Sequence, residues 1–114
     1  MSTAQDRLDA IYKSYSEAKA RRNDDWAAAQ TADQADAISR NIEGLENLYL
    51  DAANDALDAN GPAVEAAYQA AANARKAVNK AYSNAKGIAQ KISLVGDLLA
   101  SLGDLVKEAQ AATA

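Results

Sequence analysis

Hydrophobic and polar positions repeat at helical spacing along almost the whole of this chain. In its first half, apolar residues recur every three or four positions in two separate stripes, which is the periodicity of amphipathic α-helices. The first stripe consists of Leu8, Ile11, Tyr12, Tyr15 and Ala18, and the second of Ile38, Ile42, Leu45, Tyr49, Ala52 and Ala56. The pattern therefore predicts two helices before the middle of the chain.

The second half carries a seven-residue apolar repeat that runs without a skip. Seven heptads in one register are a coiled-coil signature and predict close packing of one helix on another. One series of positions reads Val64, Ala71, Val78, Ala85, Ile92, Leu99 and Val106, and its partner reads Ala67, Ala74, Ala81, Ile88, Val95, Leu102 and Ala109.

Helix boundaries are indicated by a few turn and capping residues. Asn60-Gly61-Pro62 is the strongest break, with Gly61 expected to end one helix in the left-handed region and Pro62 to begin the next. Ser2 or Thr3 is the expected first N-cap, and Thr31 with Gln34 forms a capping-box pattern. We therefore expect a break or kink between about Asn23 and Thr31, although a continuous helix remains open because no Gly or Pro lies between.

These boundaries predict an all-α protein, an antiparallel helical bundle or coiled-coil hairpin of three to four helices with its main turn at Asn60–Pro62. The single domain covers residues 1–114, with helices at about 3–30, 31–59, 62–92 and 94–111, the last two either separate or continuous. An unbroken helix from Pro62 to Gln110 would be about 73 Å long. Either the chain bends near Ser93–Asp97 and folds back into a four-helix bundle, or two chains share their C-terminal segments.

Large apolar residues are concentrated near the C-terminus. Residues 88–106 hold nine of the nineteen Leu, Ile and Val residues, whereas 30 other residues of the chain are Ala, which buries little area. Gly96 and Gly103, seven apart, indicate either close approach of another helix or a helix end. The expected protein-binding face comprises Ile88, Ile92, Val95, Leu98, Leu99, Leu102, Leu105 and Val106, together with Trp26, which either plugs the junction of the first two helices or anchors an interface.

Charge is distributed unevenly along the chain, whose net charge is −4. Residues 1–60 carry twelve acids and six bases, and residues 61–114 carry four acids and six bases. Arg75, Lys76, Lys80, Lys86 and Lys91 follow one another with no acid between them. This basic strip either packs beside the acidic first half, in the same molecule or a neighbour, or binds nucleic acid or anionic lipid. A pI of about 4.7 favours the first interpretation, and we expect no nucleic-acid partner.

Catalytic and metal-binding patterns are missing from the sequence. The chain has no His and no Cys, so the commonest general base, the commonest transition-metal ligand and thiolate chemistry are absent. No glycine-rich phosphate loop is present. The acids that begin at Asp51 fail the spacing of a Ca²⁺ loop, because Ala53 and Pro62 occupy ligand positions. The sequence therefore predicts no enzyme, no cofactor and no metal site.

Two functions fit these features. The first is a non-enzymatic interaction or assembly protein that binds a protein partner, or its own copies as a homo-oligomer, through the C-terminal apolar face. The second is reversible association with a membrane or lipid surface through the amphipathic segment 88–106, disfavoured because acids rather than bases occupy its polar side. No secretory pattern opens the chain, so the expected location is the cytoplasm, or export without a signal peptide.

Overall fold

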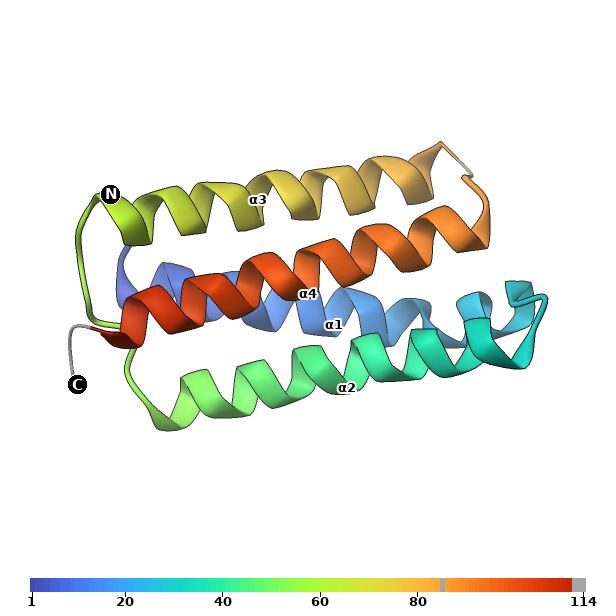
Figure 1. Cartoon of the computed structure of the whole chain (residues 1–114), viewed down its shortest axis with the longest axis horizontal. Coiled ribbons are helices and arrows are strands. Elements are labelled where there is room, and N and C mark those ends of the chain that lie inside the picture. The colour runs from blue at the N-terminus through green and yellow to red at the C-terminus, as the bar shows by residue number, and fades with distance from the viewer. Residues whose placement is uncertain (85, 112–114) are drawn as a thin grey trace.

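The computed structural model describes residues 1–84 and 86–111, and in these residues it has four α-helices and no strand (Figure 1). The helices are α1 (Ala4–Ala28), α2 (Ala32–Asn54), α3 (Pro62–Ser83) and α4 (Ile88–Ala111). Helices that follow one another in the chain run antiparallel, so the all-α bundle predicted from the sequence is confirmed. The molecule is elongated, with extents of 43 × 25 × 18 Å.

The helices surround the core in the order α1, α2, α4, α3. Packing is most extensive between α3 and α4, then between α1 and α2, and α2 also packs along α4. The parallel neighbours α1 and α3 pack on each other little, α1 also contacts α4 across the core, and α2 and α3 lie on opposite corners without packing on each other. The link from α2 to α3 therefore crosses one end of the bundle (Figure 1).

The predicted start of each of the first two helices is confirmed. Thr3 caps α1 in a reciprocal capping box, in which its side chain accepts a hydrogen bond from the Asp6 amide and the Asp6 carboxylate accepts one from the Thr3 amide. Thr31 caps α2 by accepting from the Gln34 amide at 3.1 Å. The expected break between Asn23 and Thr31 falls between Ala28 and Ala32.

The crossing link is longer than the sequence predicted, because α2 ends at Asn54 and not near residue 59. In this link, Leu57 and Ala59 are buried, and the Ala59 amide donates to the carbonyl oxygen of Ala109 at 3.1 Å. The link thus provides a hydrogen-bond donor for the Ala109 carbonyl in the last turn of α4. If α2 continued as a helix to residue 59, the Ala59 amide would bond within α2 instead, and this carbonyl would lose its partner. Gly61 does not end α2; it is the N-cap residue of α3, with φ 141°, and Pro62 follows as expected.

The last two helices are separate, and the break between Ser83 and Ile88 lies before the bend predicted near Ser93–Asp97. α3 ends at Ser83, and the Lys86 amide donates to the Ala81 carbonyl at 3.0 Å, which joins the turn to the last turn of the helix. The heptad pattern did not indicate this break, because the same two heptad positions face the core in both helices. The expected heptad residue Ala85 lies outside the described residues.

Gly96 and Gly103 both lie inside α4, so neither ends a helix. A Cβ at Gly103 would meet nothing within 4 Å among neighbouring atoms, and one at Gly96 would make only an ordinary contact with Asn41. The expected close approach is found instead at Gly44 of α2, where a Cβ would lie 2.7 Å from Cδ2 of Leu99. Here the absence of a side chain lets α2 pack closely against α4.

A buried arginine fastens the crossing link to α1. Arg7 is 0% exposed and donates through Nη1 to the carbonyls of Leu57 (2.7 Å) and Ala59 (2.8 Å). Its Nε donates to the hydroxyl of Ser2, and its Nη2 to the Ser2 carbonyl at 2.8 Å. Nη2 also lies 3.4 Å from Oε1 of Glu65, forming an ion pair with α3. The guanidinium therefore joins the N-terminal segment, the crossing link and α3.

Polar contacts also join α1 to α3 along the rest of their length, and they repeat at an almost constant sequence offset. Three of these pairs are separated by 58 residues: Arg7 with Glu65, Glu17 with Arg75, and Arg21 with Asn79. The fourth, Asp25 with Tyr82, is separated by 57. We call these four pairs the polar ladder. Long side chains bridge two helices that approach too little for extensive apolar packing.

Candidate functional site

The C-terminal face predicted as a binding surface is the core of the monomer. Because α4 folds back along α3, its apolar residues contact the other helices instead of projecting from a long rod. Ile88, Val95, Leu98, Leu102, Leu105 and Val106 are buried, and Ile92 and Leu99 are partly buried. Residues 88–106 therefore do not present the free apolar face on which both functions expected from the sequence depended. Among the described residues, no helix is long and apolar enough to cross a membrane.

Trp26, the remaining predicted binding residue, lies apart from that core and is 42% exposed. It is near the C-terminal end of α1, and its indole Nε1–H donates to the hydroxyl of Ser39 on α2 at 3.2 Å. The guanidinium carbon of Arg22 lies 5.0 Å from the ring centroid, within cation–π distance. Trp26 thus contacts the junction of the first two helices while much of its ring faces solvent.

Other aromatic and charged side chains follow Trp26 along the seam of α1 and α2. On α1 these residues recur every three or four positions and so share one side of the helix. We call this surface the aromatic face: Tyr12, Tyr15, Lys19, Arg22 and Trp26 of α1, with Ser39, Glu43, Glu46, Tyr49 and Leu50 of α2. Four of the six aromatic residues of the sequence belong to it.

Aromatic contacts across the helix pair hold this face in place. The rings of Tyr12 and Tyr49 pack at 5.2 Å between centroids, and those of Tyr15 and Tyr49 stack at 6.3 Å. The Tyr15 hydroxyl donates to the Glu46 carboxylate at 2.8 Å, and the Lys19 ammonium lies 5.8 Å from the Tyr15 ring centroid. These rings are ordered by neighbours from both helices and yet retain exposed surface, as Tyr12 does at 48%.

A shallow groove of about 190 Å³ opens in the aromatic face beside Trp26. Its walls come from both helices: Arg22 and Trp26 on one side, and Ser39, Ile42, Glu43 and Glu46 on the other. At the far end of the face, Leu50 is 51% exposed and lies one helical turn from Glu46. The face therefore combines a groove, exposed apolar surface and charged edges.

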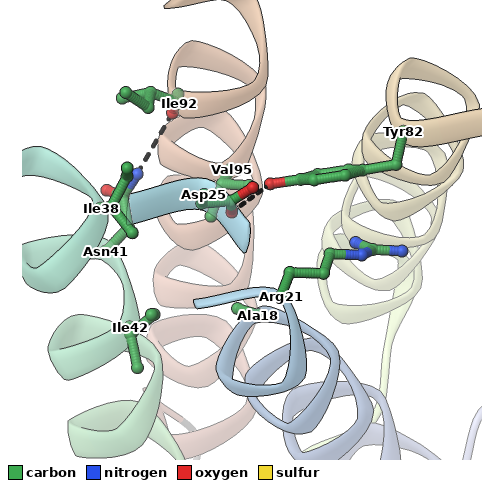
Figure 2. Close-up of a pocket in the computed structure, with 9 residues that line it drawn as sticks. All are labelled: Ala18, Arg21, Asp25, Ile38, Asn41, Ile42, Tyr82, Ile92 and Val95. Carbon is green, nitrogen blue, oxygen red and sulfur yellow. Dashed lines mark hydrogen bonds between the residues drawn. The ribbon is translucent and has the colours of Figure 1, made fainter. Parts of the chain in front are cut away.

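A separate polar cluster lies inside the end of the bundle near the α3–α4 turn (Figure 2). Asp25 of α1 points toward Tyr82 of α3 and accepts a 2.5 Å hydrogen bond from its hydroxyl. The guanidinium carbon of Arg21 lies 4.1 Å from the centroid of the Tyr82 ring. The Asn41 side-chain amide donates to the carbonyl oxygen of Ile92 at 3.2 Å. These contacts join α1 to α3 and α2 to α4 at this end of the bundle.

Burial dominates the electrostatics of this cluster. Asp25 is buried among Ala18, Ile38 and Val95, and this desolvation raises the pKa of its carboxyl despite the hydrogen bond from Tyr82. The pKa of the Tyr82 hydroxyl is also raised, first by burial and then by the Asp25 carboxylate. The cavity beside them is about 20 Å³, which accommodates about one water molecule and no organic substrate.

The described residues contain no group of acidic side chains, or of other common ligand types, arranged to hold a metal ion. Ion pairing within this part of the chain is confined to the α1–α3 side, where Arg7 pairs with Glu65 and Arg75 with Glu17. Arg75 thus follows the first interpretation of the basic strip, since it packs against the acidic first half. Hydrogen bonding from Arg75 lowers the pKa of Glu17.

Sequence reasoning identified Trp26 but missed the rest of the aromatic face. The predicted apolar seams do contain Tyr15 and Tyr49, which pack against the core, whereas Tyr12 is exposed, and nothing in the seam pattern indicated that the three rings would meet on one surface. The available signal was the spacing of residues 12, 15, 19, 22 and 26, which is helical but mixes aromatic and basic side chains.

The fold and this site define an all-α bundle with an exposed aromatic face. Comparison with known protein families, with curated proteins and with solved structures found no match to this chain.

Proposed function

We propose that this chain is a non-enzymatic helical protein that binds a protein partner through its aromatic face. The observation that carries the proposal is the exposed Trp26, held by Arg22 and Ser39 beside the groove. Trp, Tyr and Arg are the residue types most enriched among those that dominate binding energy at protein interfaces. Rings already fixed by packing also lose little side-chain freedom when a partner docks.

The proposal moves the binding surface from the C-terminal segment to α1 and α2. Recognition through residues 88–106 would require α4 to leave the bundle and expose Leu98, Leu102 and Leu105 to water. The same requirement applies to lipid binding through that segment. The aromatic face needs no such rearrangement.

Site-specific photo-crosslinking in cells that produce the protein tests the proposal. A photoreactive residue at Leu50, on the aromatic face, is compared with one at Gln69, which is exposed on α3. We expect a discrete protein adduct at position 50, its loss in Trp26→Ala, and its retention in Tyr68→Ala, a matched aromatic truncation on the opposite side. Equal adducts at positions 50 and 69, or none at position 50, would overturn the proposal.

A further inference from the structure

We infer that the partner segment docked on the aromatic face is a cationic amphipathic helix. Its apolar side chains contact Trp26 and Leu50, and its Lys or Arg side chains face the acidic side chains of α2. This inference rests on the proposed function and adds the chemistry of the partner. Two independent features support it: the pattern of unpaired charge on α2 and the shape of the apolar surface beside it.

The α2 edge of the aromatic face is strongly acidic, whereas its α1 edge carries Lys19 and Arg22. Between residues 28 and 60 the sequence has seven acids and one base, Arg40. The acids on the exposed surface of α2 are Asp33, Asp36, Glu43, Glu46 and Asp51. Within the described part of the chain, no lysine or arginine forms an ion pair with any of them, since both ion pairs lie between α1 and α3.

An acidic edge next to exposed aromatic rings is complementary to a cationic segment with an apolar side. Glu43 and Glu46 lie on the α2 wall of the groove, and Trp26 lies with Arg22 on the α1 wall, so a bound helix would place its cationic side chains toward the carboxylates and its apolar ones toward the indole. Rim charges of this kind accelerate association and exclude partners of like charge. Lys and Arg side chains also interact with the faces of Tyr and Trp rings.

A second copy of this chain fits the same surface less well. Two aromatic faces brought together with like helices in contact would place two acidic α2 helices side by side, and like charges in contact oppose association. The basic residues Lys76 and Lys80 are exposed on α3, but their neighbours Asn73 and Ala77 offer no large apolar side chain for the groove. A separate cationic helix satisfies both the charge and the apolar surface.

Trp26 provides the measurement, because it is the sole tryptophan of the sequence and borders the groove. The probe is a synthetic amphipathic helix of Leu and Lys, compared with a helix of the same pattern in which Glu replaces Lys. We expect the Leu/Lys helix to shift Trp26 emission to shorter wavelength saturably, the Leu/Glu helix to cause no shift, and the affinity to fall as salt rises.

Charge-reversal variants separate specific docking from general attraction to an acidic protein. Glu43→Lys with Glu46→Lys should weaken binding of the Leu/Lys helix by about tenfold. The matched control is Asp97→Lys with Asp104→Lys, which reverses two exposed acids on α4 and should change affinity less than about twofold. Circular dichroism and urea unfolding confirm that each double variant remains folded.

Three results would overturn the inference: equal binding of the two probe helices, equal weakening by the two double variants, or no emission shift. Sedimentation equilibrium of the protein alone provides a further test, because a dimer whose formation Trp26→Ala abolishes would assign the face to a second copy. A discrete adduct at position 50 together with any of these results would leave the proposed function standing and reject only the cationic partner.

Discussion

At the scale of single residues, the core side of α1 carries polar side chains, Arg7, Ser14 and Asp25, and each of them has a hydrogen-bond partner. Arg7 uses its whole donor set on Ser2, the crossing link and Glu65, so its charge is buried without an unpaired donor. Periodicity of apolar residues could not reveal this, because an inward-facing arginine looks like a surface position in the sequence. Asp25 escaped prediction for the same reason.

Arg7→Met should destabilise the protein by about 3–5 kcal/mol, because it leaves the buried carbonyls of Leu57 and Ala59 without their donor and the Glu65 carboxylate without its cationic partner. Arg7→Lys should recover only part of this loss, since an ammonium lacks the planar fork that reaches several acceptors. Urea unfolding measures both. Arg40→Met, on the exposed side of α2, is the control and should change stability by less than about 0.5 kcal/mol. A similar loss in Arg40→Met would contradict this account of Arg7.

The carboxylates of Asp25 and Glu17 should affect stability in opposite directions as pH changes. Burial raises the pKa of Asp25 above its unfolded value of 3.8, so its ionised form lowers stability as pH rises through the folded value. Asp25→Asn keeps an acceptor for Tyr82 and should therefore be more stable than wild type at pH 7, with the advantage vanishing below pH 3.8.

Glu17 is expected to behave in the reverse way. The hydrogen bond from Arg75 lowers its pKa below 4.5, so its contribution is present above that pH and is lost as pH falls through the folded value. Glu17→Gln should cost up to about 1 kcal/mol at pH 7, as expected for a partly exposed pair, and nothing once the pH is below the folded value. Urea unfolding of both variants from pH 2.5 to 8 checks the two signs, and parallel profiles would refute them.

At the scale of helices, most element types could be predicted from the sequence and most of the errors concern ends. Capping side chains marked the starts at Thr3 and Thr31, because such caps are local interactions. The ends at Asn54 and Ser83 depend on contacts with distant parts of the chain, as when Ala59 binds the end of α4. The heptad pattern also continues through the α3–α4 turn without a skip. The period of the sequence alone therefore does not distinguish one long helix from two helices joined by a turn.

Glycines inside the helices give a direct test of where helices approach closely. Gly103→Ala should stabilise the protein by about 1 kcal/mol, because Ala favours the helix and the new Cβ meets no neighbour within 4 Å. Gly44→Ala should gain less, because its Cβ would push Leu99 aside, and Gly44→Val should destabilise. Thermal unfolding of the three variants gives the order. An equal gain from alanine at both positions would show that α2 and α4 are not tightly packed there.

At the scale of the whole molecule, the C-terminal apolar segment forms the core of a single chain, and the reason to expect obligatory assembly disappears. We expect light scattering to give the mass of one chain, 11.9 kDa, at micromolar concentration without a partner. A stable dimer whose dissociation unfolds the protein would contradict this expectation.

Leu102→Asp should therefore unfold the bundle, not simply prevent binding. Leu102 is 1% exposed, and burying an unpaired carboxylate there should cost about 4 kcal/mol or more. Leu50→Asp, on the exposed aromatic face, should change stability by less than about 0.5 kcal/mol. Circular dichroism and urea unfolding of the two variants distinguish core from surface. A folded Leu102→Asp protein would indicate that α4 is not the core.

The polar ladder also determines how the molecule comes apart. The α1–α2 and α3–α4 hairpins share an apolar boundary between α2 and α4, but opposite that boundary α1 and α3 meet mainly through the ladder. Water can replace the hydrogen bonds of the partly exposed pairs of the ladder, Glu17 with Arg75 and Arg21 with Asn79, at little net cost, whereas it cannot replace apolar contacts. Partial unfolding should therefore begin as an unzipping of α1 from α3. In native-state hydrogen exchange, the amides of α1 should lose protection in a smaller cooperative opening than those of α3 and α4.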